Sequence, residues 1–239
     1  MSEIVAVIPA RKGSQRIKNK NTRKFKGVSL VGLSIRCALR CPLIDRIVVS
    51  TDDQVVRDIA FDHAVECFHR PSHLADDTAR TFDVLVDILE KLKTVPEFLV
   101  LLQSTSPLRE IELIEKGLKL IKDDSGASSL ISVYEHRVFT GQIENGYWFA
   151  DYPEETRSQD IPAKYIPAGS LYIYRVTDTI QKGDPFGKKV IPMLVDEGQS
   201  VNIDYESDFI KLEYVFAQYS ERFCYLFNDT PLRAVDNSM

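Results

Sequence analysis

The sequence from Ile4 to Lys26 reads IVAVIPARKGSQRIKNKNTRKFK. It opens on a short apolar run, typical of a strand buried on both faces, and continues as a loop that contains Gly13. Eight lysines and arginines fall between Arg11 and Lys26, and no acidic residue occurs between Ile4 and Ile44. That acid-free stretch holds ten basic residues in a chain whose net charge is −5, so the remaining residues carry −15. Such a concentration of cations predicts a site that attracts a polyanion.

The rest of the chain alternates strand-like and helix-like segments. Strands are expected at 44–52, 66–71, 98–103, 128–133 and 169–175, and helices near 30–39, 53–63, 78–93, 110–122 and after 204. This alternation predicts a doubly wound, mostly parallel α/β sheet, with residues 1–239 as a single domain. Ligands bind such sheets at the carboxyl ends of the strands. We therefore expect the basic loop, Thr51 with Asp52, and Gln103 with Ser104 to meet there.

The composition, with 44% hydrophobic and 27% charged residues in 239, is that of an ordinary globular protein. No apolar run approaches the ~18 residues of a membrane helix, and strand-like sequence rather than a secretory signal follows Met1. We therefore expect a cytoplasmic protein without a membrane partner. The four cysteines are not spaced as CxxC pairs, which argues against a zinc site and a disulfide framework.

The basic loop has the chemistry of a phosphate cradle. Arg11, Lys20 and the backbone amides of Gly13 and Ser14 would surround a triphosphate with donors, although neither a Walker A loop nor GxGxxG is present. A solvated basic loop or a nucleic-acid patch is the alternative. Against a nucleic-acid partner, Phe25 is the only aromatic residue in the loop and the rest of the chain is acidic.

The pattern as a whole resembles the CMP-nonulosonic acid synthetases, the acylneuraminate cytidylyltransferases that activate sialic, legionaminic and pseudaminic acids. Their signature IPAR-x-GS followed by KN is matched by Ile8, Pro9, Ala10, Arg11, Gly13, Ser14, Lys20 and Asn21. Further motifs occur in the family's order, namely VVSTDD (48–53), HRP (69–71), DDTART (76–81), LLQSTSPLR (101–109), TRSQDIP (156–162), GSLYIY (169–174) and VNIDYESDF (201–209). The resemblance thus extends over nearly the whole chain.

This resemblance implies a nucleotide-diphosphosugar-transferase-like (Rossmann-like) fold, a homodimer and a dimerisation arm at 136–168. It also implies transfer of CMP from CTP to the anomeric hydroxyl of a nine-carbon 2-keto sugar acid, with release of pyrophosphate. The implied cofactor is Mg²⁺, with Mn²⁺ as the alternative. The expected catalytic residues are Arg11 and Lys20. The expected nucleotide-binding residues are Ala10, Arg11, Gly13, Ser14, Asn21 and Arg70, and the sugar-binding residues are Gln103, Arg157, Tyr172 and Phe186.

The resemblance also places the metal at Asp204, with Asn202 beside it. The family usually reads Asp-Ile-Asp here, whereas this chain reads Asn202-Ile203-Asp204, so Asn202 would offer a neutral carbonyl oxygen. Asp204 could instead cap a helix that starts near Tyr205. Arg109 is a weaker sugar-binding candidate that we expect to cap the following helix.

Several simpler roles and other functions stay open at this stage. Ser14 and Asn21 could be caps, Arg70 a surface salt bridge and Tyr172 a core aromatic residue. The motifs mix features of the sialic, legionaminic and pseudaminic branches, so the acceptor is not fixed. Alternative functions are a nucleotidyltransferase for another acceptor such as Kdo, and a CTP-binding regulatory protein without turnover, for which Asn202 is the warning sign.

Overall fold

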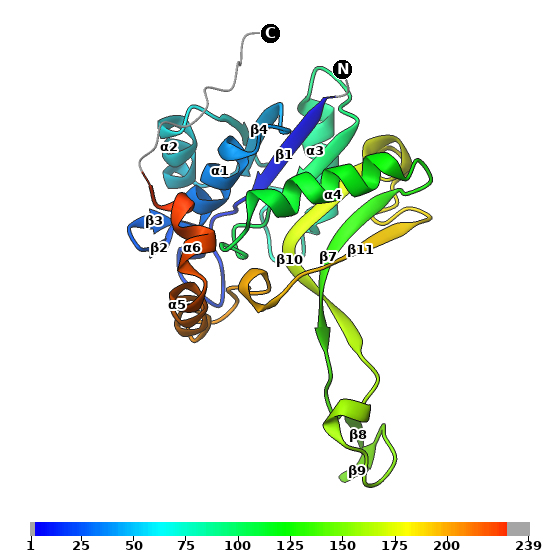
Figure 1. Ribbon diagram of the computed structural model, residues 1–239. Coiled ribbons are helices and arrows are strands. Elements are labelled where there is room, and N and C mark those ends of the chain that lie inside the picture. The colour runs from blue at the N-terminus through cyan, green and yellow to red at the C-terminus, as the bar shows by residue number, and fades with distance from the viewer. Residues whose placement is uncertain (1–2, 229–239) are drawn as a thin grey trace.

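The computed structural model describes residues 3–228, which build a seven-stranded sheet in the order β11-β7-β10-β6-β1-β4-β5 (Figure 1). Its strands are β1 (Ile4–Pro9), β4 (Arg46–Thr51), β5 (Glu66–His69), β6 (Phe98–Leu101), β7 (Ser129–His136), β10 (Lys164–Arg175) and β11 (Val190–Leu194). Within this sheet four pairings are parallel, and β10 alone runs antiparallel to both of its neighbours. The predicted mostly parallel α/β fold is therefore confirmed.

Helices cover both faces of this sheet. They are α1 (Leu30–Arg40), α2 (Gln54–Asp62), α3 (Thr81–Lys91), α4 (Ile111–Asp123), α5 (Asp208–Gln218) and α6 (Ser220–Phe223). In β1, Ile4, Ala6 and Ile8 pack in one hydrophobic cluster with α1 and α4. Val5 and Val7 pack in a second cluster with α3, on the other side of the sheet (Figure 1). Because both faces of β1 are covered, the strand contains no polar residue.

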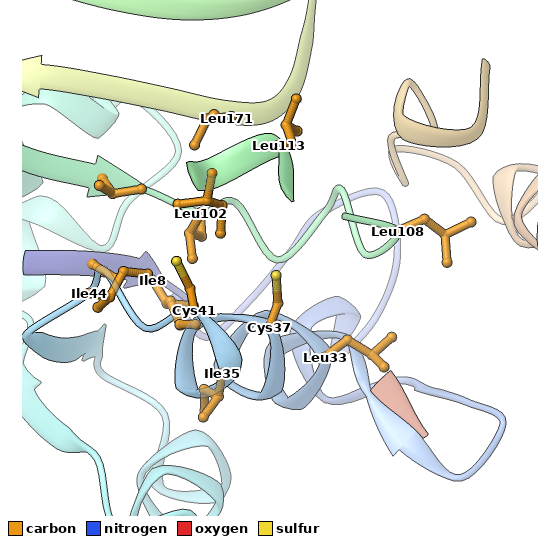
Figure 2. Close-up of a cluster of buried hydrophobic side chains, with 14 of the residues drawn as sticks. Ile8, Leu33, Ile35, Cys37, Cys41, Ile44, Leu102, Leu108, Leu113 and Leu171 are labelled. Atoms are coloured by element: carbon orange, nitrogen blue, oxygen red, sulfur yellow. The ribbon is translucent and has the colours of Figure 1, made fainter. Parts of the chain in front are cut away.

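Helix α1 supports the strand from which the basic loop departs. It begins after Ser29, whose hydroxyl accepts a hydrogen bond from the Gly32 amide at 3.1 Å. Figure 2 shows Cys37 on the side of α1 that is turned toward Ile8 and the sheet, and Cys41 directly after the helix on the same side. Both thiols are completely buried, and burial raises the pKa of Cys41 to about 11.

A narrow ribbon projects from the sheet between β7 and β10 (Figure 1). Its far end is the hairpin of β8 (Gly141–Glu144) and β9 (Tyr147–Ala150). Exposed large apolar side chains of this segment are Phe139, Ile143, Tyr147, Trp148, Phe149 and Tyr165. The ribbon coincides with the segment 136–168 for which the sequence predicts a dimerisation arm, and its role in joining two subunits stays a prediction.

Strand β10 carries a bulge where it leaves the ribbon and enters the sheet. The register shifts between Pro167 and Tyr172, so residues 168–171 lie opposite the single residue Ser132 of β7. The Ser132 hydroxyl accepts hydrogen bonds from the Leu171 amide at 2.9 Å and from the Ser170 hydroxyl at 3.0 Å. The bulge therefore keeps its polar groups paired although it leaves the regular ladder.

Short elements complete the described part of the chain. The strands β2 (Lys24–Phe25) and β3 (Val28–Ser29) form a small hairpin after the basic loop. Short 3-10 turns lie at Lys20–Thr22, Ser72–Leu74, Ser158–Asp160, Val176–Asp178, Ile180–Lys182, Glu197–Gln199 and Cys224–Leu226. No helix within residues 3–228 is long and apolar enough to cross a membrane.

Two expectations about elements need correction. The edge strand β11 is absent from the strands expected from the sequence, because Pro192 interrupts its apolar run and proline is tolerated in a sheet mainly at an edge. The last long helix begins at Asp208 rather than near Tyr205. The Asp208 carboxylate accepts hydrogen bonds from the Asp204 and Tyr205 amides, each at 2.7 Å, so Asp204 is not the cap of this helix.

Candidate functional site

The carboxyl ends of β1 and β6, the basic loop and the segment before α3 enclose an open pocket of about 210 Å³. The residues around it are Pro9, Arg11, Ser14, Lys20, Asn21, Arg70, Leu74, Ala79, Thr81, Val84, Gln103, Ser104 and Thr105. Parallel strands end at one edge of the sheet, which is why segments 90 residues apart in the sequence line one cavity. The sequence predicts this meeting of the basic loop with Gln103 and Ser104, and the structure confirms it.

Side-chain hydrogen bonds attach the basic loop to this edge. The Asn21 amide donates to the Arg11 carbonyl at 2.9 Å, and its oxygen accepts from the Ser104 hydroxyl at 2.7 Å. The Lys12 amide donates to the Asp52 carboxylate at 2.7 Å. The loop after β1 is thereby fixed to the loops after β4 and β6, so the cations that it carries keep a defined place at the pocket.

Arg11 reaches across the pocket mouth. Its guanidinium donates to the Gly13 carbonyl at 3.1 Å and to the Asp77 carboxylate at 2.6 Å. The other Asp77 oxygen accepts a hydrogen bond from Gln15. Arg11 is therefore paired with a carboxylate of the chain itself. Asp77 is a functional residue that the sequence does not predict, since its only signal there is its place in the DDTART motif.

Arg70 forms a buried cationic wall. Its side chain donates to the Ser50 carbonyl at 2.9 Å and to the Ser50 hydroxyl at 3.3 Å, and only 4% of the residue is exposed. Burial lowers the pKa of Arg70 to about 10, with the nearby Asp52 carboxylate acting in the opposite direction. The alternative of a surface salt bridge for Arg70 is therefore wrong.

Lys20 links the pocket to the proposed metal residues. Its ammonium donates to the Ile203 carbonyl at 2.8 Å and to the Asp204 carboxylate at 3.2 Å. The second oxygen of Asp204 accepts from the Asn202 amide at 2.7 Å. The Arg16 guanidinium lies 3.6 Å from Asp204. Asp204 is thus surrounded by donors, and no group of three His, Cys, Asp or Glu side chains in residues 3–228 could hold a metal ion.

Gln103, Ser106 and Asn202 converge on the β10 bulge. Gly169 has φ +76°, a conformation that side chains rarely adopt, and a Cβ there would lie 2.7 Å from the Ser106 hydroxyl and 3.0 Å from the Gln103 side-chain oxygen. The Ser106 hydroxyl also lies 3.3 Å from the Asn202 side-chain oxygen. A glycine at 169 therefore lets the predicted sugar-binding and metal-binding side chains share one corner beside the pocket.

The structure separates other predicted residues from this corner. Arg157 lies on the projecting ribbon, where it pairs with Asp160 at 2.7 Å. Phe186 precedes β11, and its carbonyl accepts from Ser129 at the first residue of β7, so it lies at the opposite edge of the sheet. Tyr172 packs against the core cluster beside α3. Neither aromatic residue lines the pocket of its own chain, and Tyr172 has the core role that the sequence analysis left open.

Of the remaining predicted residues, Ser14 lines the pocket, whereas Ala10 and Gly13 shape the loop beside it. Ala10 is buried, and its backbone bonds to the Ser50 carbonyl at 3.0 Å and to the Thr51 hydroxyl at 2.5 Å. Gly13 has φ +74°, the left-handed conformation that glycine adopts without strain.

Arg109 differs from its expectation as a helix cap. It is completely buried, whereas the N-cap position of α4 is Glu110, which makes no capping hydrogen bond with its side chain.

Comparison with known proteins agrees with this geometry. Residues 5–182 match the family model described as Cytidylyltransferase. Post-translational flagellin modification protein B of Campylobacter coli is 30% identical, over 91% of this chain and 97% of that protein. CMP-N,N'-diacetyllegionaminic acid synthase of Campylobacter jejuni is also 30% identical, over 91% of this chain and 96% of that protein.

Other matches cover less of their partner or show only the fold. N-acylneuraminate cytidylyltransferase of Escherichia coli O18:K1:H7 is 27% identical over 87% of this chain, which spans about half (51%) of that protein. A solved structure of CMP:2-keto-3-deoxy-manno-octonic acid synthetase complexed with CTP has a TM-score of 0.66 at 16% identity. It covers 91% of this chain and 100% of its own, so the fold is shared.

The family model covers well over half of the chain and includes the basic loop, Arg70 and Gln103, while Asn202 and Asp204 lie beyond it. Two relatives match at 30% identity over nearly their full length. The chain therefore belongs to the cytidylyltransferase family.

Proposed function

We propose that this chain transfers CMP from CTP to the anomeric hydroxyl of a nine-carbon 2-keto sugar acid and releases pyrophosphate. The observation that carries the proposal is the pocket at the carboxyl edge of the sheet, where Arg11, Lys20 and Arg70 gather around one cavity. A pocket lined by cations attracts a triphosphate, and Arg11 and Lys20 are the two that we assign to its phosphates. The relative named as a CMP-N,N'-diacetyllegionaminic acid synthase supports the choice of a nine-carbon acid.

The proposed reaction is an in-line displacement at the α-phosphorus of CTP. The acceptor hydroxyl forms a bond to phosphorus while the bond to the pyrophosphate oxygen breaks, and the hydroxyl proton passes to solvent. The protein has to hold the two reactants in line and neutralise charge on the leaving group. Arg11 and Lys20 serve the leaving group in this proposal, Ser14 and the Gly13 amide add phosphate contacts, and Asn21 and Arg70 lie on the nucleoside side.

Magnesium is the proposed cofactor, with Mn²⁺ as the alternative. Mg²⁺ is commonly held by one or two carboxylates together with substrate phosphates and waters. Asp204 supplies the carboxylate of such a partial shell, and Lys20 connects it to the pocket. The Asn202 amide donates to Asp204 while its oxygen lies beside Ser106, so Asn202 would add its neutral oxygen once its side-chain amide turns over. When bound, the ion would supply further charge neutralisation at the triphosphate. Because donors surround Asp204, we propose that the metal arrives with CTP rather than before it.

The sugar acid brings a carboxylate, and we propose that Gln103 binds the sugar while Arg157 of a second copy pairs with the carboxylate. Gln103 lines the pocket, whereas Arg157 lies on the projecting ribbon and is 69% exposed. A homodimer in which the ribbon reaches a partner would combine them. The exposed aromatic side chains of the ribbon support this, because such surfaces are typical of protein interfaces. Tyr172 and Phe186 are left out of the proposed sugar site.

The cytoplasm is the compartment that we propose. Cys37, Cys41, Cys67 and Cys224 are all unpaired, and unpaired thiols persist where glutathione keeps cysteines reduced.

The decisive experiment is pyrophosphate release with CTP and Mg²⁺ against sialic, legionaminic, pseudaminic and Kdo acids, with ATP, GTP and UTP as controls. We expect release with CTP and one nine-carbon acid. Release with Kdo alone would move the acceptor to the eight-carbon class. Saturable CTP binding without release across the panel would support the alternative of a CTP-binding regulatory protein.

A pair of variants tests the phosphate role. Arg11→Ala should lower kcat/KM by at least about a hundredfold if its charge stabilises the transition state. Lys18→Ala removes an exposed cation from the same loop, outside the pocket, and should stay within twofold of the parent. Equal effects of both substitutions would mean that only the general charge of the loop matters.

A further inference from the structure

Arg109 is a completely buried cation without a carboxylate partner among the described residues. Burial lowers the pKa of its guanidinium, and the neighbouring Cys37 and Tyr225 side chains act in the opposite direction. Taking an arginine out of water is costly unless its donors are satisfied. A neutral donor would join two backbone segments with a smaller desolvation cost. We therefore look for the role of Arg109 in the fixed, planar arrangement of its donors.

The guanidinium of Arg109 joins two segments that flank the pocket. It donates to the Gln103 carbonyl at 3.0 Å, in the loop after β6. It also donates to the Ser170 carbonyl, in the bulge of β10. A longer contact of 3.5 Å reaches the Ser34 hydroxyl on α1. One side chain therefore fixes the distance between the Gln103 backbone and the bulge.

The backbone of Arg109 is itself held from the other side. Its carbonyl accepts a hydrogen bond from the Tyr225 hydroxyl, and the Cys37 thiol lies 3.9 Å away. Tyr225 also lies 3.3 Å from the Cys37 sulfur. Arg109 is thus anchored to α1 and to the segment after α6, which makes it a stable support for the two pocket segments.

The loop of Gln103 and the β10 bulge, which Arg109 joins, come into contact at Gly169. A Cβ on Gly169 would come within 3.0 Å of the Gln103 side-chain oxygen and 2.7 Å of the Ser106 hydroxyl, so no slack exists between bulge and loop. The Thr105 carbonyl accepts from the Ile203 amide at 2.7 Å, which extends the same contact to the segment of Asn202.

We propose that Arg109 is a positioning residue for the acceptor half of the site, which sets the place of the Gln103 side chain against the Gly169 bulge. It acts on the sugar acid through Gln103 and has no part in holding CTP. The identity of the substrate in this inference rests on the proposed function. The coupling between the Gln103 loop and the β10 bulge rests on the geometry alone.

The test compares Arg109→Lys with Arg175→Lys. Arg175 lies at the other end of β10 and also donates to backbone carbonyls, of Ala127 at 3.0 Å and Ile121 at 2.7 Å, so it is a matched control away from the pocket. We expect Arg109→Lys to raise the KM for the sugar acid about tenfold, because the variant loses one hydrogen bond made by a charged group. The KM for CTP should stay within twofold of the parent value. Arg175→Lys should change both constants by less than twofold. Equal changes in both constants for Arg109→Lys would overturn the proposal.

Amide hydrogen exchange gives a readout that does not depend on activity. Arg109→Lys should accelerate exchange about tenfold in 103–106 and 168–171, and leave the basic loop 11–21 unchanged. Unchanged exchange in the two segments, or equal acceleration throughout the chain, would contradict positioning. A parent enzyme that releases no pyrophosphate would refute the proposed function, while the exchange data would still decide the role of Arg109.

A second pair of variants applies if Arg109→Lys does not fold. Gly169→Ala pushes a methyl group against Gln103 and Ser106, whereas Gly183→Ala has a similar positive φ of +70° with no atom within 4 Å of the new Cβ. We expect Gly169→Ala to raise the KM for the sugar acid with little change for CTP, and Gly183→Ala to change neither. An unchanged KM for the sugar acid in Gly169→Ala would overturn the coupling.

Discussion

Removing the negative charge of Asp77 should tighten CTP binding. This carboxylate lies 2.6 Å from the Arg11 guanidinium, and the two side chains are 43% and 30% exposed. An ion pair of that exposure contributes about 0.5–1 kcal/mol. If the triphosphate has to displace Asp77 from Arg11, then Asp77→Asn removes that competition and lowers the Kd for CTP about two- to fivefold.

Isothermal titration with CTP, without sugar acid, measures this effect directly. Asp83→Asn is the matched control, since Asp83 also pairs with an arginine, Arg80 at 2.8 Å, and not with Arg11. Its Kd should stay within 1.5-fold of the parent value. The gain in Asp77→Asn should shrink as ionic strength rises, because exposed charges are screened. Weaker CTP binding by Asp77→Asn would refute the reasoning and show that Asp77 helps to bind the nucleotide.

Asn202→Asp supplies a second carboxylate at the proposed metal site, so magnesium binding measured by titration in the presence of CTP should become about tenfold tighter; unchanged binding would remove residue 202 from the metal shell. If the proposed homodimer forms through the ribbon, Trp148→Ser should raise its dissociation constant at least about tenfold in analytical ultracentrifugation, because Trp148 is an exposed aromatic residue of the ribbon. Phe61→Ser, on the exposed face of α2, should leave that constant unchanged. Iodoacetamide at pH 8 should modify Cys224, which is exposed, and should spare Cys41, whose buried thiol has its pKa raised to about 11, as counted by mass spectrometry; rapid modification of Cys41 would contradict its burial.

The elements that the sequence predicts well are those whose pattern follows from burial. The run from Ile4 to Ile8 is apolar because both faces of β1 are covered, and the loop after it carries its cations at the carboxyl edge as expected. Strand β11 is not predicted, because an edge strand needs fewer apolar residues than a central one and Pro192 interrupts its apolar run.

The site depends on contacts that no local pattern records. Arg11 meets Asp77 across 66 positions, and Lys20 meets Asp204 across 184. The IPAR and KN signature identifies the cations, but only the folded chain pairs them with these carboxylates. Arg109 is the extreme case, since a sequence that places an arginine just before a helix gives no sign that the side chain is buried between a loop and a bulge.

The β10 bulge also determines which side chains the projecting ribbon presents on each of its two faces. Five positions separate Pro167 from Tyr172, whereas only two separate their partners Val133 and Ile131 on β7. Side chains of a strand alternate between faces, so the odd count on β10 decides which face its outer half presents. Deleting one residue between Pro167 and Tyr172 would turn Lys164–Pro167 over while the inner half of β10 kept its pairing. A chain of this fold could thus redirect the surface that it offers to a partner by changing its length at one place, without altering its sheet.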